Sequence, residues 1–324
     1  MGPVDGTARE AAVLPAAFLE RLQRMIPPSQ WDAVLRTFTQ PKPTTFRVNT
    51  LKADSASIRQ QLEASGFRLE TVPWNHAAFT LRNGQLRNLQ ETPCYQRGEI
   101  YVQSLASMLP ALVLDPQPDE RVLDLTAAPG SKTTQIACLM RGRGRLVAND
   151  NNRIRGYKLQ ANVKQQGAAN VEISRRHGEA FGKVGAEPFD RVLVDAPCGT
   201  EGRFFTGRPS SYNYWKPRKI HEMVVKQRRL LEAGARALRL GGVLVYSTCT
   251  FAPEENEGVV NWVLGRFDGA LDIEPIVVPI PNTMPGLTVW EEKVFCTSLS
   301  RTVRVLPTDD MEGFFVARLK KRDS

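Results

Sequence analysis

The sequence predicts a doubly wound, mostly parallel α/β sheet preceded by a smaller α+β module. Strand patterns and helix patterns alternate from Arg121 onward, which is typical of a parallel sheet with helical crossovers. Arg191–Val194 is almost continuously apolar, as strands buried on both faces are. The 324 residues allow one large domain and a smaller one. We expect domains over residues 1–98 and 119–324, joined by a strand and a helix over 99–118.

The amino-terminal module is expected to combine short helices and strands. Apolar residues recur at helical spacing over Leu14–Phe38, and Pro27-Pro28 divides this stretch into two helices. Ser55–Ser65 is a third helix, with Ser55 as its amino-terminal cap and Gly66 as its stop. Alternating segments favour strands at Phe46–Asn49, Arg68–Val72 and Ala78–Leu81. The pattern fits either an RNA-binding module or a packing appendage.

The connecting segment and the large domain follow in regular order. A strand at Ile100–Val102 and a helix from about Ser104 end at the turn Asp115–Pro118. The strands expected in the large domain are Val122–Leu125, Arg145–Ala148, Val171–Ser174, Arg191–Val194, Val243–Tyr246 and a closing strand at Phe314–Leu319. The helices expected there are Lys132–Met140, Arg153–Gln165, Met223–Leu240, which stops at Gly241-Gly242, and Glu254–Phe267.

Charge, cysteine content and apolar runs limit the kinds of protein that the chain can be. Lys and Arg number 43 against 34 Asp and Glu, a net charge of +9 that suits a polyanion such as RNA but is also common in ordinary soluble proteins. Five cysteines without close pairing disfavour a disulfide framework and a metal site, so we expect a reducing, cytoplasmic setting and no metal. No apolar run reaches the roughly 20 residues of a membrane span, and residues 1–15 lack the pattern of a signal peptide.

The segment Asp124–Thr133 joins the first strand of the large domain to its helix. Gly130 and its small neighbours let the backbone approach a ligand, and the helix start offers free N–H donors. The segment matches neither the Walker loop nor the dinucleotide fingerprint, and an ordinary strand–helix turn is the alternative. Asp150, at the end of the next strand, suits hydrogen bonds from ribose hydroxyls or a cap on the following helix.

Two cysteines, Cys198 and Cys249, come directly after the carboxyl ends of strands. A doubly wound sheet builds its ligand site at that edge. A single buried cysteine is usually an inert apolar residue, and we interpret Cys94, Cys138 and Cys296 in that way. Two cysteines at matching strand ends are harder to attribute to packing, so they are candidate reactive thiols.

The motifs DLTAAPGSKT, DAPC and YSTCT together resemble the motif set of the Sun/Nop family of RNA cytosine-5 methyltransferases. RVNTLK, EEN and EGFFVARLKK extend the resemblance over most of the chain, and the amino-terminal pattern resembles the bacterial ribosomal-RNA branch most. The resemblance implies a Rossmann-like methyltransferase sheet, S-adenosylmethionine as cofactor, an RNA-binding amino-terminal module and a monomer. Ribosomal RNA is the favoured substrate, and transfer RNA is the alternative.

The reaction of this family explains why its site contains two thiols. Carbon 5 of cytosine becomes nucleophilic only after a thiolate adds to carbon 6, which is covalent catalysis. The resemblance implies that Cys249 attacks and that Cys198 helps to resolve the adduct. It also implies that Asp195 binds the N3 edge of the base, and that Cys198, Asp195 or water removes the carbon 5 proton. Lys132 would stabilise a thiolate or hold substrate, unless it is only a solvated lysine.

The resemblance also implies a set of cofactor contacts. The family holds the cofactor on residues that match Thr126, Ala127, Ala128, Pro129, Gly130, Ser131, Lys132, Asp150 and Asp195. His177 stands where the family has an acidic residue for the adenine, and Glu179 is the alternative contact. Thr126 and Ser131 also replace the more common cysteine and glycine, and GTEG follows Cys198 in place of SGxG. None of these departures removes a thiol.

Two segments of the sequence are candidates for contact with RNA. Gly202–Lys219 mixes aromatic and cationic residues, which suits single-stranded RNA, although Phe204, Phe205 and Trp215 could instead be core residues. The run Arg141, Arg143 and Arg145 fits RNA contact or a basic turn equally well. One competing function is a DNA cytosine methyltransferase with Cys198 as the nucleophile, and another is a non-catalytic RNA-binding assembly factor. Amino-group methylation is disfavoured, because DAPC is not an Asn/Asp-Pro-Pro-aromatic site.

Overall fold

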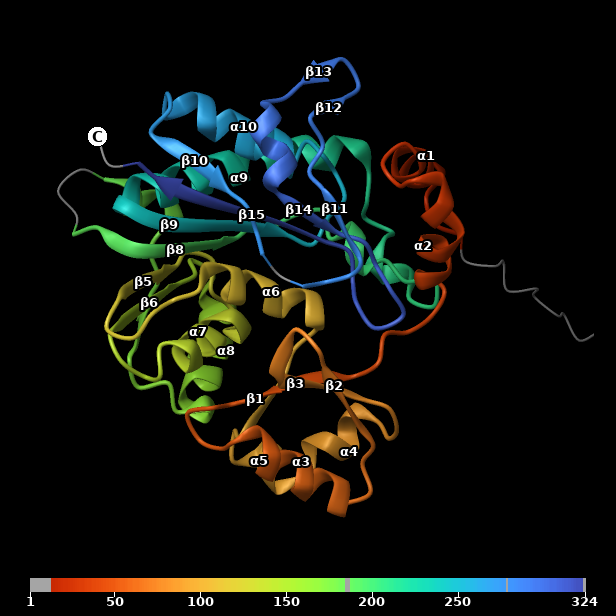
Figure 1. Cartoon of the computed structure of the whole chain (residues 1–324), viewed down its shortest axis with the longest axis vertical. Helices are drawn as coiled ribbons and strands as arrows, with labels where there is room; N and C mark the ends of the chain where they lie inside the picture. The colour runs from red at the N-terminus through yellow and green to blue at the C-terminus, as the bar shows by residue number, and fades with distance from the viewer. Residues whose placement is uncertain (1–12, 184–186, 278, 323–324) are drawn as a thin grey trace, which may run out of the picture.

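The computed structural model describes residues 13–183, 187–277 and 279–322, so most of the segment 1–15 lies outside it. The described residues form a nine-stranded sheet, a four-stranded sheet and a two-stranded ribbon. The nine-stranded sheet and its helices make the large domain, and the four-stranded sheet makes a smaller module beside it (Figure 1). No helix among the described residues is both long and apolar enough to cross a membrane.

Five parallel strands form the centre of the large sheet. In spatial order they are β9 (Leu238–Thr248), β8 (Phe189–Asp195), β5 (Arg121–Asp124), β6 (Arg145–Asn149) and β7 (Val171–Ser174). The chain runs from β5 outward to β7 and then returns to the other side of β5 with β8. This reversal confirms the predicted doubly wound fold, and ligands of such sheets bind at the carboxyl ends next to the reversal.

An antiparallel extension continues the sheet beyond β9. The strand β15 (Phe314–Lys321) runs antiparallel to β9 and is the closing strand that the sequence predicts. The short strands around it are β10 (Leu271–Glu274), β11 (Thr283–Pro285) and β14 (Val303–Val305), and β12 (Val289–Trp290) pairs with β13 (Lys293–Val294) in the separate ribbon. Four of these strands have only two or three residues, too few to show an alternating pattern, whereas the alternation Leu-Asp-Ile-Glu of β10 is present in the sequence.

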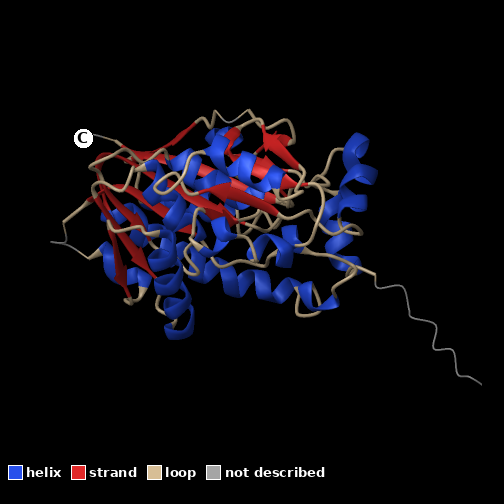
Figure 2. Cartoon of the chain, turned by 90° about the horizontal axis from the view of Figure 1, so that it is seen from below, coloured by secondary structure: helices blue, strands red, loops and turns tan. Residues whose placement is uncertain are grey.

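Helices cover both faces of the large sheet (Figures 1 and 2). One face carries α6 (Leu105–Leu114), α7 (Ser131–Leu139) and α8 (Arg153–Gln166), and the other carries α9 (Pro217–Ala237) and α10 (Glu257–Arg266). Alternate residues of the central strands belong to two separate buried clusters: Leu123 and Val192 to one, Val122 and Leu193 to the other. Burial on both faces explains why these strands are nearly continuous apolar runs.

Several predicted boundaries are wrong. The helix α9, expected from about Met223, begins at Pro217. The helix expected to reach Leu240 ends at Ala237, and β9 begins at once, so that Gly241-Gly242 lies inside the strand. The pairing of β9 with β8 shifts register at this point, as a glycine-bearing bulge does. In the amino-terminal module, Asp54 rather than Ser55 caps the helix α3 (Ser55–Ala64), because its side chain accepts a hydrogen bond from the backbone of Ser57.

The smaller module has its own sheet and core. Its strands lie in the order β2 (Leu69–Val72), β3 (Asn75–Leu81), β1 (Thr45–Val48) and β4 (Ile100–Val102), all antiparallel. β4, expected in the connecting segment, thus completes the module. The helices α3, α4 (Leu86–Gln90) and α5 (Pro93–Gln96) pack on one face, with Ile58 and Leu62 against Phe46 and Phe79. The very short α4 and α5 are not evident from the sequence.

The first two helices pack on the large domain (Figure 1). These are α1 (Ala16–Gln23) and α2 (Trp31–Thr37), separated by the single turn η1 (Pro28–Gln30) as the two prolines predict. Phe18 of α1 meets the rings of Phe38, Phe204 and Trp215 at centroid distances of 5.7, 4.9 and 5.8 Å. Residues 14–38 therefore contribute to the core beside β8 and β9 and not to the core of the smaller module.

Candidate active site

A cavity of about 660 Å³ lies at the carboxyl ends of β5, β6 and β8, within the size range of small-molecule sites. It brings together every predicted site residue except Gly130. These residues are Thr126, Ala127, Ala128, Pro129, Ser131, Lys132, Asp150, His177, Glu179, Asp195, Cys198 and Cys249. The cysteines Cys94, Cys138 and Cys296 do not line it. The cavity therefore lies where the reversal of strand order predicts a site.

The loop between β5 and α7 is fixed by hydrogen bonds to neighbouring strand ends. The Thr126 hydroxyl donates to the carbonyl of Asp195 (2.8 Å), and the Ala127 N–H donates to the carbonyl of Asn149 (2.8 Å). Gly130, with φ of +108°, caps α7, and a Cβ there would lie 2.9 Å from a side-chain carbon of Leu159. Gly130 thus shapes the loop through close packing with α8 and does not line the cavity itself.

Asp150 faces the cavity from the end of β6. It is buried, its Oδ1 accepts from the N–H of Asn152 (2.9 Å), and its Oδ2 lies 3.2 Å from the Arg155 guanidinium. The alternative interpretation of Asp150 as the helix cap is wrong, because the Asn152 side chain accepts the capping bond from the Arg155 N–H (3.0 Å). Asp150 is therefore a carboxylate at the cavity wall.

Asp124 also lines the cavity but is absent from the predicted site. Its position at the end of β5 is the one feature of the sequence that could have indicated it. Its Oδ2 accepts from the Thr133 hydroxyl (2.7 Å), while its buried Oδ1 has no hydrogen-bond partner among the described residues. Burial raises the pKa of the Asp124 carboxyl to about 7, and the nearby Asp195 carboxylate adds to the effect. A buried acceptor at a cavity wall with no partner suits a ligand that brings a donor.

His177 and Glu179 both lie at the cavity wall. They flank Gly178 at the start of the short helix η2 (Gly178–Gly182), and both side chains are exposed. Nδ1 of His177 lies 3.5 Å from the amide nitrogen of Asn151. The geometry thus keeps both side chains available to a ligand and does not select one.

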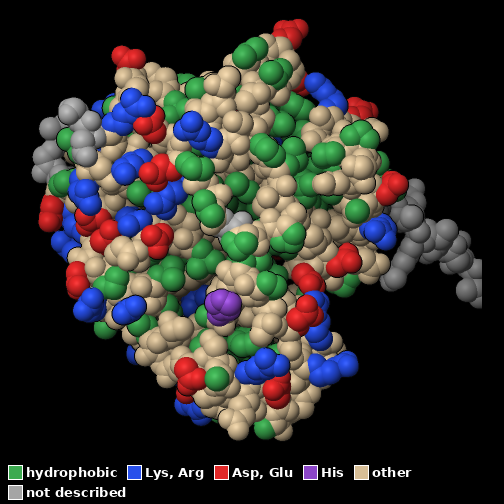
Figure 3. Space-filling view, viewed as in Figure 1, with side chains coloured by type: hydrophobic (Ala, Val, Ile, Leu, Met, Phe, Trp, Pro, Cys, Tyr) green, Lys and Arg blue, Asp and Glu red, His purple; other side chains and the backbone are tan. Residues whose placement is uncertain are grey.

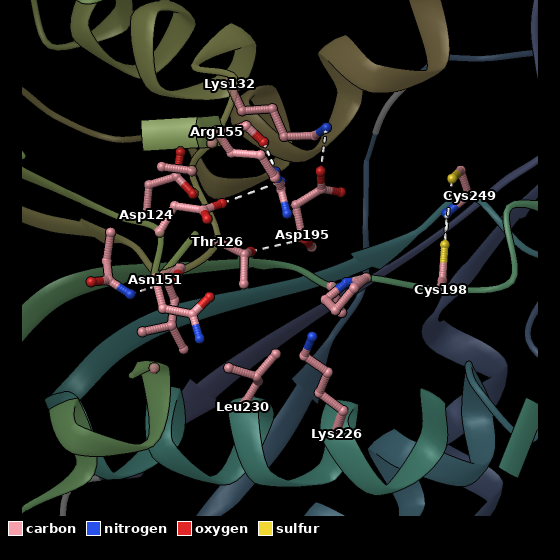
Figure 4. A pocket seen from close by; sticks show the side chains of 18 of the residues that line it. Asp124, Thr126, Lys132, Asn151, Arg155, Asp195, Cys198, Lys226, Leu230 and Cys249 are labelled. Carbon is pink, nitrogen blue, oxygen red and sulfur yellow. Dashed lines mark hydrogen bonds and ion pairs between the residues drawn. The ribbon is translucent and has the colours of Figure 1, made fainter. Parts of the chain in front are cut away.

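Asp195 and Lys132 form an ion pair in the cavity, in which Lys132 is buried and Asp195 is partly exposed (Figure 4). Nζ of Lys132 donates to Oδ2 of Asp195 (2.7 Å) and to the hydroxyl of Ser107 (2.8 Å). The Ser247 hydroxyl donates to Oδ1 of Asp195 (2.8 Å). The interpretation of Lys132 as a solvated lysine is therefore wrong, and both oxygens of Asp195 are held in place.

The two predicted thiols are in direct contact. Sγ of Cys198 lies 3.4 Å from Sγ of Cys249, and the Cys249 N–H points to Sγ of Cys198 at 3.3 Å (Figure 4). The hydrogen bond from Cys198 lowers the pKa of the Cys249 thiol, and the Arg203 guanidinium contributes in the same direction. The same bond and burial raise the pKa of Cys198. The contact therefore favours ionisation of Cys249 over ionisation of Cys198.

The helix α9 supplies one wall of the cavity. Glu222, Lys226 and Leu230 recur every four residues on one helix face and line the cavity together with Arg229. Figure 4 shows Lys226 and Leu230 extending from the helix toward the strand ends. The helical spacing of polar residues next to an apolar face could have drawn attention to these positions.

The aromatic and basic segment Gly202–Lys219 has two parts. Phe204, Tyr212 and Trp215 are buried against α1, which favours the packing interpretation for them. Tyr214 is 68% exposed, and Nζ of Lys219 lies 5.7 Å from the centre of its ring. Further exposed cations of the segment are Arg208, Lys216 and Arg218. Figure 3 shows Lys and Arg side chains interspersed with Asp and Glu on the face it displays, so the positive charge forms no continuous patch there.

The arginine run between α7 and β6 lies away from the cavity. Arg145 begins β6, at the opposite end of the strand from the cavity, and pairs with Glu172 (2.7 Å). Arg143 pairs with Asp119 (3.1 Å). These contacts favour the interpretation of the run as a basic turn.

Comparisons with known proteins identify the family of the chain. The chain matches the family described as 16S rRNA methyltransferase RsmB/F over residues 111–320, and the N-terminal domain of 16S rRNA methyltransferase RsmF over residues 14–105. It is 37% identical to the ribosomal RNA small subunit methyltransferase F of Shigella dysenteriae over 320 residues, which are 97% of this chain and 64% of that protein. The enzyme of the same name from Serratia proteamaculans is 37% identical over 98% of this chain and 65% of its own length.

A solved structure gives the same result for the fold. A methyltransferase homolog protein from Pyrococcus horikoshii aligns with a TM-score of 0.78 and 32% identity, over 95% of this chain and all of that one. The chain spans just under two thirds of the length of the curated relatives above. The chain belongs to the RsmB/F family of 16S rRNA methyltransferases.

Proposed function

We propose that the chain is an S-adenosylmethionine-dependent RNA methyltransferase that forms 5-methylcytidine in ribosomal RNA. The observation that carries the proposal is the pair of thiols 3.4 Å apart, in one cavity with the Lys132–Asp195 ion pair. Membership of the RsmB/F family and the names of the curated relatives support ribosomal RNA over transfer RNA. Residues 14–105 match the N-terminal domain of RsmF, and the smaller module would contribute to RNA binding.

The cavity fits S-adenosylmethionine. When bound, this cofactor supplies an electrophilic methyl group on a positively charged sulfur. The backbone of Thr126–Lys132 and the Asp195 carboxylate would hold it, and Asp150 would accept hydrogen bonds from its ribose hydroxyls. Oδ1 of Asp124, which has no partner among the described residues, would accept from its ammonium group. His177 or Glu179 would contact the adenine.

Cys249 would begin the reaction as a thiolate. Its sulfur would form a bond to carbon 6 of cytosine. The electron pair released from the C5–C6 double bond would then form a bond from carbon 5 to the methyl group, whose bond to the cofactor sulfur would break with its electrons left on that sulfur. The Asp195 carboxyl, fixed by Lys132 and Ser247, binds the N3 edge and favours protonation of the ring as the adduct forms.

Resolution of the adduct returns the thiolate. A base takes the carbon 5 proton, the remaining electron pair restores the C5–C6 double bond, and the C6–S bond breaks with its electrons on Cys249. Cys198, Asp195 or water can be that base. Cys198 also lies in position to donate a hydrogen bond to the departing sulfur, at the 3.4 Å separation. Both thiols must stay reduced, which the cytoplasm provides.

Methyl transfer to purified RNA tests the proposal. The full chain is incubated with labelled S-adenosylmethionine and either 16S ribosomal RNA or transfer RNA, and the nucleosides are separated. We expect labelled 5-methylcytidine in ribosomal RNA, no product with Cys249→Ala, and normal product with Cys296→Ala, an exposed control thiol.

Three other outcomes would each contradict a different part of the proposal. An active Cys249→Ala variant beside an inactive Cys198→Ala variant would indicate the mechanism in which Cys198 is the nucleophile. Product in transfer RNA alone would overturn the choice of substrate. No methyl transfer to any RNA would favour the non-catalytic assembly factor.

A further inference from the structure

Two buried side chains outside the cavity hold the backbone on both sides of Cys198. Oε2 of Glu255 accepts from the Gly199 N–H (3.0 Å) and from Nε2 of Gln227 (2.6 Å). Nε2 of Gln227 also donates to the carbonyl of Pro197 (2.9 Å). Both side chains have 0% exposure. The segment Pro197–Gly199 is thus fastened to α9 and to the turn that precedes α10.

The packing around this pair is close. A Cβ at Gly199 would lie 2.8 Å from Oε1 of Glu255, so only a glycine allows this approach without a shift. The Tyr246 hydroxyl donates to the backbone carbonyl of Glu255 (2.6 Å), which fixes the turn that carries the carboxyl group. The Cys198 loop and the Glu255 turn therefore hold each other in one arrangement.

No ion pair among the described residues includes Glu255, so its carboxyl has no counter-charge there. Burial raises its pKa to about 8, and the Glu201 and Cys249 groups add to the effect. The titratable groups around it are Cys198 and Glu201 from the loop after β8, Tyr246 from β9, and Cys249 just beyond the end of β9. The raised pKa favours the neutral form of the carboxyl, which accepts N–H bonds without adding charge beside the thiols.

We propose that Glu255 and Gln227 are positioning residues that keep the Cys198 thiol in hydrogen-bond contact with Cys249, and thereby keep Cys249 reactive. Neither residue lines the cavity, so neither touches substrate or cofactor. The inference rests on the proposed function, in which Cys249 is the attacking thiolate.

The test compares variants of the full chain in two assays. Glu255→Ala and Gln227→Met each remove the contacts to the Cys198 segment, whereas Glu255→Gln preserves size, neutrality and an acceptor oxygen. Gln166→Met is the matched control, because Gln166 is another buried glutamine, in α8, with an amide bonded to a backbone carbonyl. Thermal unfolding identifies variants that fail to fold.

The first assay needs no RNA. Iodoacetamide alkylates Cys249 at a series of pH values, and the modified peptide is quantified by mass spectrometry. Loss of the Cys198 hydrogen bond in Glu255→Ala and Gln227→Met should raise the apparent pKa of Cys249 by about one unit and slow alkylation at pH 7 about tenfold. Glu255→Gln and Gln166→Met should behave as wild type. An unchanged profile in folded Glu255→Ala and Gln227→Met would overturn the inference.

The second assay measures methyl transfer to 16S ribosomal RNA. Turnover should fall about tenfold in Glu255→Ala and Gln227→Met and return in Glu255→Gln. If the wild type transfers no methyl group, the proposed function fails, while the alkylation profiles still decide the inference. Equal turnover loss in Glu255→Gln and Glu255→Ala would contradict it, since the neutral, same-sized side chain should suffice.

Discussion

Substitution of Glu255 by glutamine should stabilise the protein in a pH-dependent way. The buried carboxyl has a pKa of about 8 in the folded chain, against an ordinary value of 4.5. Because the folded value is raised, its contribution to stability is fully present below pH 4.5 and is lost as the pH rises through 8. At about 1.4 kcal/mol per pH unit, the loss at pH 7 is about 3 kcal/mol. A glutamine, neutral at every pH, avoids this loss.

Denaturant unfolding of wild type and Glu255→Gln between pH 4.5 and 9 measures the difference. The two free energies of unfolding should coincide near pH 4.5 and diverge with rising pH, with the variant more stable by about 3 kcal/mol at pH 7. A constant difference at all pH values would show that the carboxyl ionises normally. A variant less stable than wild type at pH 8 would refute the reasoning outright.

Three further substitutions follow from the site and the core. Gly130→Ala places a side chain on a residue with φ of +108° and should weaken S-adenosylmethionine binding, measured by calorimetry, by about tenfold. Gly66→Ala is the control, because Gly66 has φ of +85° but open space around it, and this variant should leave the affinity unchanged. Lys132→Met removes the cation that lies 2.7 Å from Asp195. The variant should have a kcat about a hundredfold lower and an unchanged affinity for RNA, and a normal kcat would contradict the role of the ion pair. Phe18→Ala removes a ring buried among three others and should lower the free energy of unfolding by about 3–5 kcal/mol; a loss below about 1 kcal/mol would show that α1 only rests on the surface.

The sequence predicts most of the parallel centre of the fold and the members of the site. Strands buried on both faces, such as β5 and β8, contain uninterrupted apolar residues, and the cysteines follow strand ends. Because parallel strands end at one edge, Cys198 and Cys249 are expected together although 51 positions separate them. The 3.4 Å contact itself depends on side-chain geometry that no pattern encodes.

Other features depend on tertiary contacts that local patterns do not contain. The apolar faces of α1 and α2 predict burial, but not burial against Phe204 and Trp215 of the large domain. The start of β9 at Leu238 follows from pairing with Phe189 and overrides the helical pattern of the sequence. The bond between Gln227 and Glu255 joins residues whose types are usually exposed, so composition gives no hint of it.

Mapping the covalent bond between protein and RNA tests the central claim most directly. The Cys198→Ala variant is incubated with S-adenosylmethionine and 16S ribosomal RNA, the RNA is digested, and the peptide that retains a nucleotide is sequenced by mass spectrometry. In the proposed mechanism Cys198 takes part in resolution of the adduct, so its loss should slow that step, and we expect a methylated cytidine nucleotide attached to Cys249. Absence of any nucleotide on Cys249 in this variant, together with a nucleotide on Cys198 in the Cys249→Ala variant, would contradict the assignment of the nucleophile.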